Sequence, residues 1–411
     1  MSINNIFKEF PGTDELINWF NENGSDKTLL VNCHFHTPYS FSAFSEMEQI
    51  FKMAADEGIS VLGISDFTAE GYSEFCELAK GYRIFPLFNI EFMVLQKEEQ
   101  DNQIRVNDPN NPGRTYFTGK ALSYPVQLNL PYQKILESVL RESNIQIAEM
   151  IDKLNVFLSE FGSDIQFDFD EIKAHYAKNL LRERHIARAL RIAVDEKYNL
   201  IKEKMEFYTL LFSGRPVKSS LKDEVSLENE IRENLLKAGG RAFVPENSRA
   251  FLSLKKAKDI IANAGGLPCY PVMLDNAKGE FTEYEEDKEL LCQKLISNKV
   301  FCIEFITGEN DFSILKSYVK YFHEKKFVIT FGTEHNTAQL NPIKVFCRNG
   351  IELDEELKKI SYEGACVLAA HQYLIAKGEK GFQDENGYTL KDEMSRFILL
   401  GKAAIQYFIN T

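Results

Sequence analysis

Asn32-Cys33-His34-Phe35-His36-Thr37 closes an apolar run that begins at Thr28 and has the composition of a buried β-strand. Side chains alternate between the two faces of a strand, so His34 and His36 point to the same side. Two imidazoles on one face can reach a single metal ion, although two incidental histidines in an ordinary strand would give the same pattern. Because the chain has only seven histidines in 411 residues, this spacing favours a metal site at the carboxyl end of a strand.

The composition favours a large globular protein that works in the cytoplasm. Hydrophobic residues make up 44% of the chain, which is enough for an extensive core. The net charge of −13 argues against binding to extended nucleic acid, so we expect a small anionic substrate as the partner. The seven scattered cysteines match neither a disulfide framework nor a zinc-ribbon spacing, as is usual in a reducing compartment. A signal peptide and membrane-spanning segments are not expected.

Strand-like and helix-like segments alternate in two blocks of the sequence. The first block predicts a helix over 45–58 with Ser45 as N-cap, a strand over 59–65 that ends on Asp66, a helix over 71–80 and a strand over 83–90 that ends on Glu91. The second block predicts helices over 254–264, 284–297 and 311–325, with strands over 267–270, 299–305 and 327–331. Such alternation indicates parallel β/α units, in which polar residues gather at the carboxyl ends of the strands.

The two blocks are separated by a long stretch whose pattern is mostly helical. We therefore expect a split α/β barrel, with its first part in residues 1–98 and its second part in residues 246–345. Residues 99–245 would form a helical insert. Residues 346–411 contain two further helical patterns, over 354–376 and 390–408, and would pack on the outside of the barrel.

Five segments, in the same order along the chain, resemble motifs of the PHP superfamily, which is named for polymerase and histidinol phosphatase. They are His34-Phe35-His36-Thr37, Ile64-Ser65-Asp66-Phe67, Asn89-Ile90-Glu91, Ala264-Gly265-Gly266 leading to Cys269-Tyr270-Pro271, and Gly332-Thr333-Glu334-His335-Asn336. The helical insert is similar to that of the nucleotide and oligonucleotide phosphoesterase branch. The resemblance implies a distorted (β/α)7 barrel and metal-dependent phosphoesterase activity.

The resemblance supplies one complete metal site and leaves two others without ligands. It assigns the ligands of the first ion to His34, His36, Glu91 and Glu334. Where the family has ligands for two further ions, this chain has Phe41, Phe67, Tyr270 and Asn336. Two imidazoles and two carboxylates suit zinc, iron(II) or manganese, so we expect one divalent ion as the cofactor. Phe67 and Tyr270 are expected to fill the space of the missing ligands and to narrow the mouth of the barrel.

Two residues are candidates for proton transfer at this site. Asp66 is either a general base or a carboxylate that orients a metal-bound imidazole. His335 either turns into the site as a ligand or general acid, or stays behind the ligands.

The basic segment 173–191 is the candidate for phosphate binding. It has six Lys and Arg residues against one Glu. The resemblance implies that Arg184, His185 and Arg188 lie near the substrate phosphate, and their spacing brings them close together on a helix. A basic face in contact with solvent would give the same sequence.

Taken together, these patterns predict a cytoplasmic hydrolase with a single metal ion. We expect this hydrolase to act as a phosphoesterase on a small phosphorylated or nucleotide-like substrate. The alternative is a catalytically silent PHP-like scaffold for binding or regulation, since four positions of the metal sites have lost their ligands.

Overall fold

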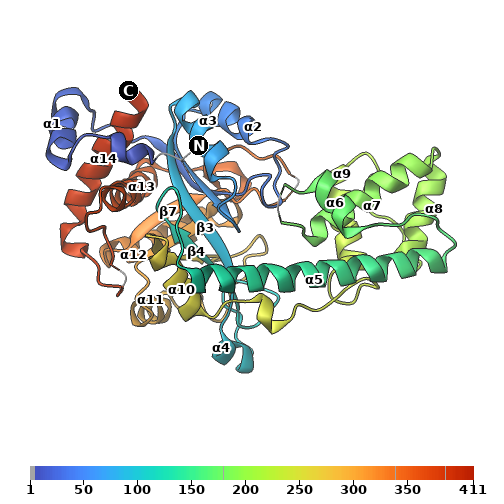
Figure 1. Cartoon of the computed structure of the whole chain (residues 1–411). Helices are drawn as coiled ribbons and strands as arrows, with labels where there is room; N and C mark the ends of the chain where they lie inside the picture. Colours follow the sequence, from blue (N-terminus) through green and yellow to red (C-terminus); the bar gives the residue numbers. More distant parts are fainter. Residues whose placement is uncertain (1–4, 179, 338, 385) are drawn as a thin grey trace.

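The computed structural model describes residues 5–178, 180–337, 339–384 and 386–411, which form a seven-stranded barrel with a helical arm (Figure 1). The strands are β1 Leu30–Phe35, β2 Ile59–Asp66, β3 Phe85–Leu95, β4 Arg114–Lys120, β5 Leu267–Val272, β6 Cys302–Ile306 and β7 Val328–Gly332. Each strand pairs with its neighbours in chain order. All pairs are parallel except those of β4, which runs antiparallel to β3 and β5. The prediction of an α/β barrel is confirmed.

The barrel closes where the end of β7 meets the end of β1. The main-chain N–H groups of Thr333 and Glu334 donate to the His34 carbonyl at 2.9 and 3.2 Å, and the His36 N–H donates to the Glu334 carbonyl at 2.8 Å. A Cβ atom on Gly332 would lie 2.3 Å from the Cβ of His34, so a glycine is needed for this approach. The closure places the residues after β7 beside the two histidines of β1.

The fourth strand corrects the predicted boundary of the insert. Residues 114–120 lie inside the range 99–245 that the sequence assigned to the insert, yet they form β4 of the barrel. The turn at 110–113 reverses the chain, so that β4 pairs antiparallel with the second half of β3. For the same reason β3 continues to Leu95 and does not end near Glu91.

Helices cover the outside of the barrel. They are α2 Met47–Asp56, α3 Tyr72–Tyr82, α10 Leu254–Asn263, α11 Lys288–Ser297 and α12 Phe312–Glu324. The prediction of Ser45 as the N-cap of α2 is wrong, because the cap position is Glu46. The N–H and the hydroxyl of Ser45 both donate to the side chain of Gln49.

The helical arm extends from the barrel and has its own hydrophobic core. It consists of α5 Leu130–Glu160, α6 Phe169–Tyr176, α7 Glu183–Lys197, α8 Ile201–Leu211 and α9 Glu224–Ile231, which continues into a π-helical turn at Arg232–Leu236. In Figure 1 the long α5 runs from the barrel along the whole arm. Leu154, Leu190 and Ile231 meet in the core of the arm, which is separate from the two clusters that surround the barrel strands.

The C-terminal helices cover the closure of the barrel. The helix α13 Glu355–Ala376 packs on β7 and β1, while α14 Met394–Asn410 packs between α13 and α1 Thr13–Asn23. The remaining elements are short: α4 Lys97–Asp101, β8 Phe346–Cys347, β9 Ile351–Glu352, and 3₁₀ turns at Ile6–Glu9, Ser248–Ala250, Thr307–Glu309, Arg348–Gly350 and Lys391–Glu393. Among the described residues, no helix combines the length and the apolar character that a bilayer crossing requires.

Candidate metal centre

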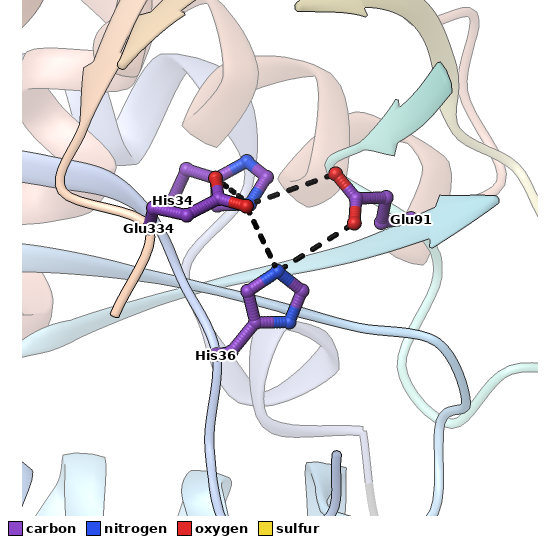
Figure 2. Close-up of side chains that lie close together, drawn as sticks. All are labelled: His34, His36, Glu91 and Glu334. Atoms are coloured by element: carbon purple, nitrogen blue, oxygen red, sulfur yellow. Dashed lines mark ion pairs between the residues drawn. The ribbon is translucent and has the colours of Figure 1, made fainter. Parts of the chain in front are cut away.

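Four side chains from three strands and the residues that follow them converge at the mouth of the barrel (Figure 2). His34 lies in β1 and His36 directly after it, Glu91 lies within β3, and Glu334 follows β7. The Nε2 atom of His34 lies 3.9 Å from Glu91 and 3.3 Å from Glu334, and that of His36 lies 3.5 Å from each carboxylate. Ligands at 2.0–2.1 Å from a tetrahedral zinc ion are separated by about 3.4 Å. The spacing of the four side chains therefore fits one ion.

The atoms that face one another in this cluster lack partners in the protein. His34 Nε2, His36 Nε2 and Glu91 Oε2 are buried and have no hydrogen-bond partner in the described part of the chain. Such atoms are rare in folded proteins because their desolvation is not compensated. A divalent ion bound by imidazole and carboxylate would satisfy all three, so the residues present fit this group.

The charges of the cluster also favour a cation. Burial raises the pKa of Glu91, and the neighbouring Glu334 carboxylate raises it further. Burial opposes a positive charge on His36, but Asp66, Glu334 and Glu91 outweigh it and raise the pKa of His36 to about 10. Both shifts have the same origin, which is a dense group of carboxylates held out of water.

The ring of His36 is oriented from behind by Ser40 and Asp66. The Ser40 hydroxyl donates to Asp66 at 2.5 Å, so its oxygen accepts the Nδ1 proton of His36 at 3.1 Å. Asp66 also accepts the N–H of Thr37 at 2.8 Å and the Thr37 hydroxyl. With these donors and no exposure, Asp66 has the geometry of an orienting carboxylate, which was one of its two predicted roles.

His335 is held away from the four converging side chains. Its Nε2 donates to the carbonyl of Asn341 at 2.9 Å, so its Nδ1 accepts the Thr333 hydroxyl at 2.8 Å. Burial lowers the pKa of His335. Both ring nitrogens are occupied, as the second of its two predicted roles requires.

A cavity of about 670 Å³ leads from Glu91 to the helical arm. Phe41, Phe67 and Asn336 line it on the barrel side, and Arg182, Arg184, Arg232 and Lys237 line it on the arm side. Arg232 pairs with Glu183 at 2.7 Å, but Arg184 and Lys237 make no ion pair within the residues described. Burial and, to a smaller extent, the nearby Arg232 lower the pKa of Arg184 to about 10. An anion beside Arg184 would compensate its buried charge.

The two aromatic residues expected at the barrel mouth behave differently. Phe67 stacks on the ring of His36 with centroids 5.5 Å apart, and the guanidinium of Arg182 lies 5.2 Å above Phe67. Tyr270 does not line the cavity, because it packs in the cluster under α10 and α11 and donates its hydroxyl to Glu285 at 2.7 Å. The expectation that it narrows the mouth is therefore wrong.

Of the three residues predicted to bind phosphate, only Arg184 lines the cavity. The Nδ1 of His185 accepts the N–H of Arg182 at 3.0 Å, and its ring packs edge-on against Phe41. Arg188 lies above the same Phe41 ring and pairs with Glu228 at 3.5 Å. His185 and Arg188 therefore hold α7 against the barrel and do not face the cavity.

Sequence reasoning missed two buried residues behind His34, Glu304 of β6 and Lys120 of β4. Glu304 is the one charged residue in the apolar strand Cys302–Ile306, which is a signal that could have been used. Lys120 could not be found, because β4 itself was not expected.

Comparisons with known proteins agree with this fold. Residues 32–213 match the model of the PHP domain family. No curated protein matches the sequence. Among solved structures, this chain is similar to a "putative metal-dependent phosphoesterase" from Bifidobacterium adolescentis, with 14% identity and a TM-score of 0.52, over 82% of this chain and 96% of the other. An amidohydrolase from Chromobacterium violaceum, with bound sulfate and no metal, has 17% identity and a TM-score of 0.48, over 77% and 93% of the two chains.

Proposed function

We propose that this protein is a metal-dependent hydrolase that acts as a phosphoesterase on a small phosphorylated substrate. The observation that carries the proposal is the group of buried, unpartnered nitrogen and oxygen atoms from His34, His36 and Glu91, at one end of a cavity that is also lined by Arg184 and Lys237. The description of the Bifidobacterium structure as a phosphoesterase supports the same reaction class.

His34, His36, Glu91 and Glu334 would hold one zinc, iron(II) or manganese ion. When bound, such an ion supplies Lewis acidity and lowers the pKa of a coordinated water. Ser40 and Asp66 keep the His36 ring in place, and Asn336 donates to Glu334 at 2.6 Å and restricts its carboxylate. Phe67 covers His36 on the cavity side and keeps water from that face of the ring.

The substrate would be anionic and small enough for the cavity. Arg184 and Lys237 line the arm side without carboxylate partners among the described residues, so they are available for a phosphate group. Arg232 is already engaged by Glu183 and adds to the local field. All seven cysteines are unpaired and buried, which supports a reducing compartment such as the cytoplasm.

The proposal is tested first by metal analysis of protein purified without added metal, before and after incubation with zinc, iron(II) or manganese. We expect about one equivalent of bound metal, and its loss in His34→Ala and His36→Ala. His175→Ala removes an exposed histidine of α6 and should keep the metal.

The loaded protein is then screened against nucleotides, phosphosugars and short oligonucleotides. Hydrolysis that disappears in the same two variants would support a phosphoesterase. Protein that binds none of the three metals would refute the proposal and favour a silent scaffold.

A further inference from the structure

Behind His34, on the side away from the cavity, lies a second buried charge group. The Nδ1 of His34 lies 2.9 Å from Oε2 of Glu304, and the ammonium of Lys120 donates to the same oxygen at 2.5 Å. The Thr118 hydroxyl donates to the other oxygen of Glu304 at 2.9 Å. The side chains of His34, Glu304 and Lys120 have no exposure to solvent. Three strands, β1, β6 and β4, thus meet through one chain of polar contacts.

We propose that Glu304 and Lys120 are positioning residues that present Nε2 of His34 to the ion. A neutral imidazole has one N–H and one nitrogen with a free lone pair. Because a carboxylate oxygen of Glu304 lies 2.9 Å from Nδ1, a proton on Nδ1 is favoured there, and this leaves the lone pair on Nε2, which is the atom that faces Glu91 and Glu334. The inference rests on the metal binding in the proposed function and extends it to residues outside the ligand set.

Lys120 has a distinct part in this arrangement. Besides Glu304, it donates to the carbonyl of Cys33 at 3.1 Å, so one ammonium holds both the carboxylate and the main chain next to His34. Glu304 accepts from Lys120 through one carboxylate oxygen and from the Thr118 hydroxyl through the other, so both oxygens are held as acceptors. Removing Lys120 would leave a buried carboxylate without its cation, which is costly and loosens its position.

The experiment measures zinc affinity by competition with a chromophoric chelator, starting from metal-free protein. Glu304→Gln and Lys120→Met should each weaken zinc binding by about tenfold to a hundredfold, the usual effect of losing a partner behind a metal ligand. Both residues act through one carboxylate. The fold loss of zinc affinity in the double variant should therefore be clearly smaller than the product of the fold losses in the two single variants.

Glu285→Gln is the matched control. Glu285 is also fully buried, but among the described residues it accepts its hydrogen bonds from Tyr270 and from the N–H groups of Met273 and Leu274, and not from any of the four ligands. This variant should bind zinc as wild type does. Unchanged zinc affinity in Glu304→Gln and Lys120→Met, or effects that multiply fully, would overturn the inference.

A second readout does not depend on the variants. In zinc-loaded wild type with ¹⁵N-labelled histidine, long-range ¹⁵N–¹H correlation identifies the bound nitrogen of each ring, and seven histidines keep the spectrum simple. His34 should bind through Nε2 and carry its proton on Nδ1. Zinc on Nδ1 would overturn the positioning role while leaving the proposed function intact. Absence of zinc binding in wild type would overturn both.

Discussion

At the residue scale, the candidate centre depends on backbone conformations that are unfavourable for most side chains. Glu334 and His335 both have positive φ angles, of 67° and 53°. Each such residue costs on the order of 1 kcal/mol or more, and persists only where its surroundings hold it. Here the hydrogen bonds with His34 and His36 hold Glu334, and the Ala43 N–H donates to the His335 carbonyl at 3.1 Å. The unfavourable backbone brings the Glu334 carboxylate over β1.

Gly332→Ala should disturb this closure directly. The added methyl group would lie 2.3 Å from the Cβ and 2.7 Å from the carbonyl oxygen of His34, and neither atom belongs to a flexible side chain. We expect a loss of roughly 1–3 kcal/mol in the free energy of unfolding, the range for overpacking, together with weaker metal binding. Urea denaturation and metal titration measure the two effects.

Gly81→Ala provides the comparison, because Gly81 lies in α3 and its Cβ would meet nothing within 4 Å. That change should stabilise the protein by up to about 1 kcal/mol, as in an ordinary helix. Equal stability of the two variants would show that β1 and β7 can separate without cost.

His34 and His36 could be predicted from the sequence because they stand two positions apart at the end of an apolar strand, and Glu91 and Glu334 because they stand in motifs that resemble those of the PHP superfamily. The residues that orient them could not. Ser40 lies in a loop after β1. Lys120 reaches Glu304 only because the barrel places β4 and β6 on either side of β5. Contacts of this kind depend on tertiary structure, which a local pattern does not contain.

At the element scale, the pattern of alternation predicted most strands and helices but not β4, which lies between the two blocks of alternating strands and helices. The polar loop before β4 also looked like the start of the arm. The helix α13 shows the reverse case: its length was expected, but the sequence did not show which of its polar side chains are buried among the apolar ones.

His371 is one such group and predicts how stability changes with pH. It bridges α13 to the loops on either side of it, since Nε2 donates to the Gly265 carbonyl at 2.8 Å and Nδ1 accepts the Phe382 N–H at 3.0 Å. Burial lowers its pKa to about 4, from an ordinary value near 6.5. Between these values the unfolded chain binds a proton that the folded protein does not, so stability falls as the pH drops from about 6.5 to about 4.

The expected contribution of His371 is at most roughly 3 kcal/mol across that interval. Glutamine can form both hydrogen bonds without titrating, so His371→Gln should flatten the pH dependence of the free energy of unfolding. Urea denaturation at several pH values between 7 and 4 measures this, within the range where both proteins fold. Parallel curves for the variant and wild type would contradict it.

At the scale of the whole molecule, the cavity belongs to neither part alone. The barrel contributes Glu91 and Phe67, and the arm contributes the cations of α7 and of the turn after α9. Phe41 joins the two parts, because the guanidinium groups of Arg184 and Arg188 lie 5.4 and 4.8 Å above its ring. The sequence predicted an arm with a basic segment. It could not show which of these cations pair with carboxylates of α9, as Arg188 does with Glu228, and which face the cavity.

Arg184→Ala tests the role of the arm in binding the anion. With inorganic phosphate as the probe, calorimetry on metal-free protein should show binding that this variant weakens by about tenfold or more, the usual effect of losing a charged hydrogen-bond donor. Lys202→Ala is the matched control, since it removes one positive charge from the arm at a side chain that is 84% exposed on α8 and does not line the cavity. If the two variants bind phosphate equally well, the field of the arm acts only at long range, and Arg184 does not contact the anion. A loss confined to Arg184→Ala would place the phosphate beside α7, facing the four residues at the barrel mouth.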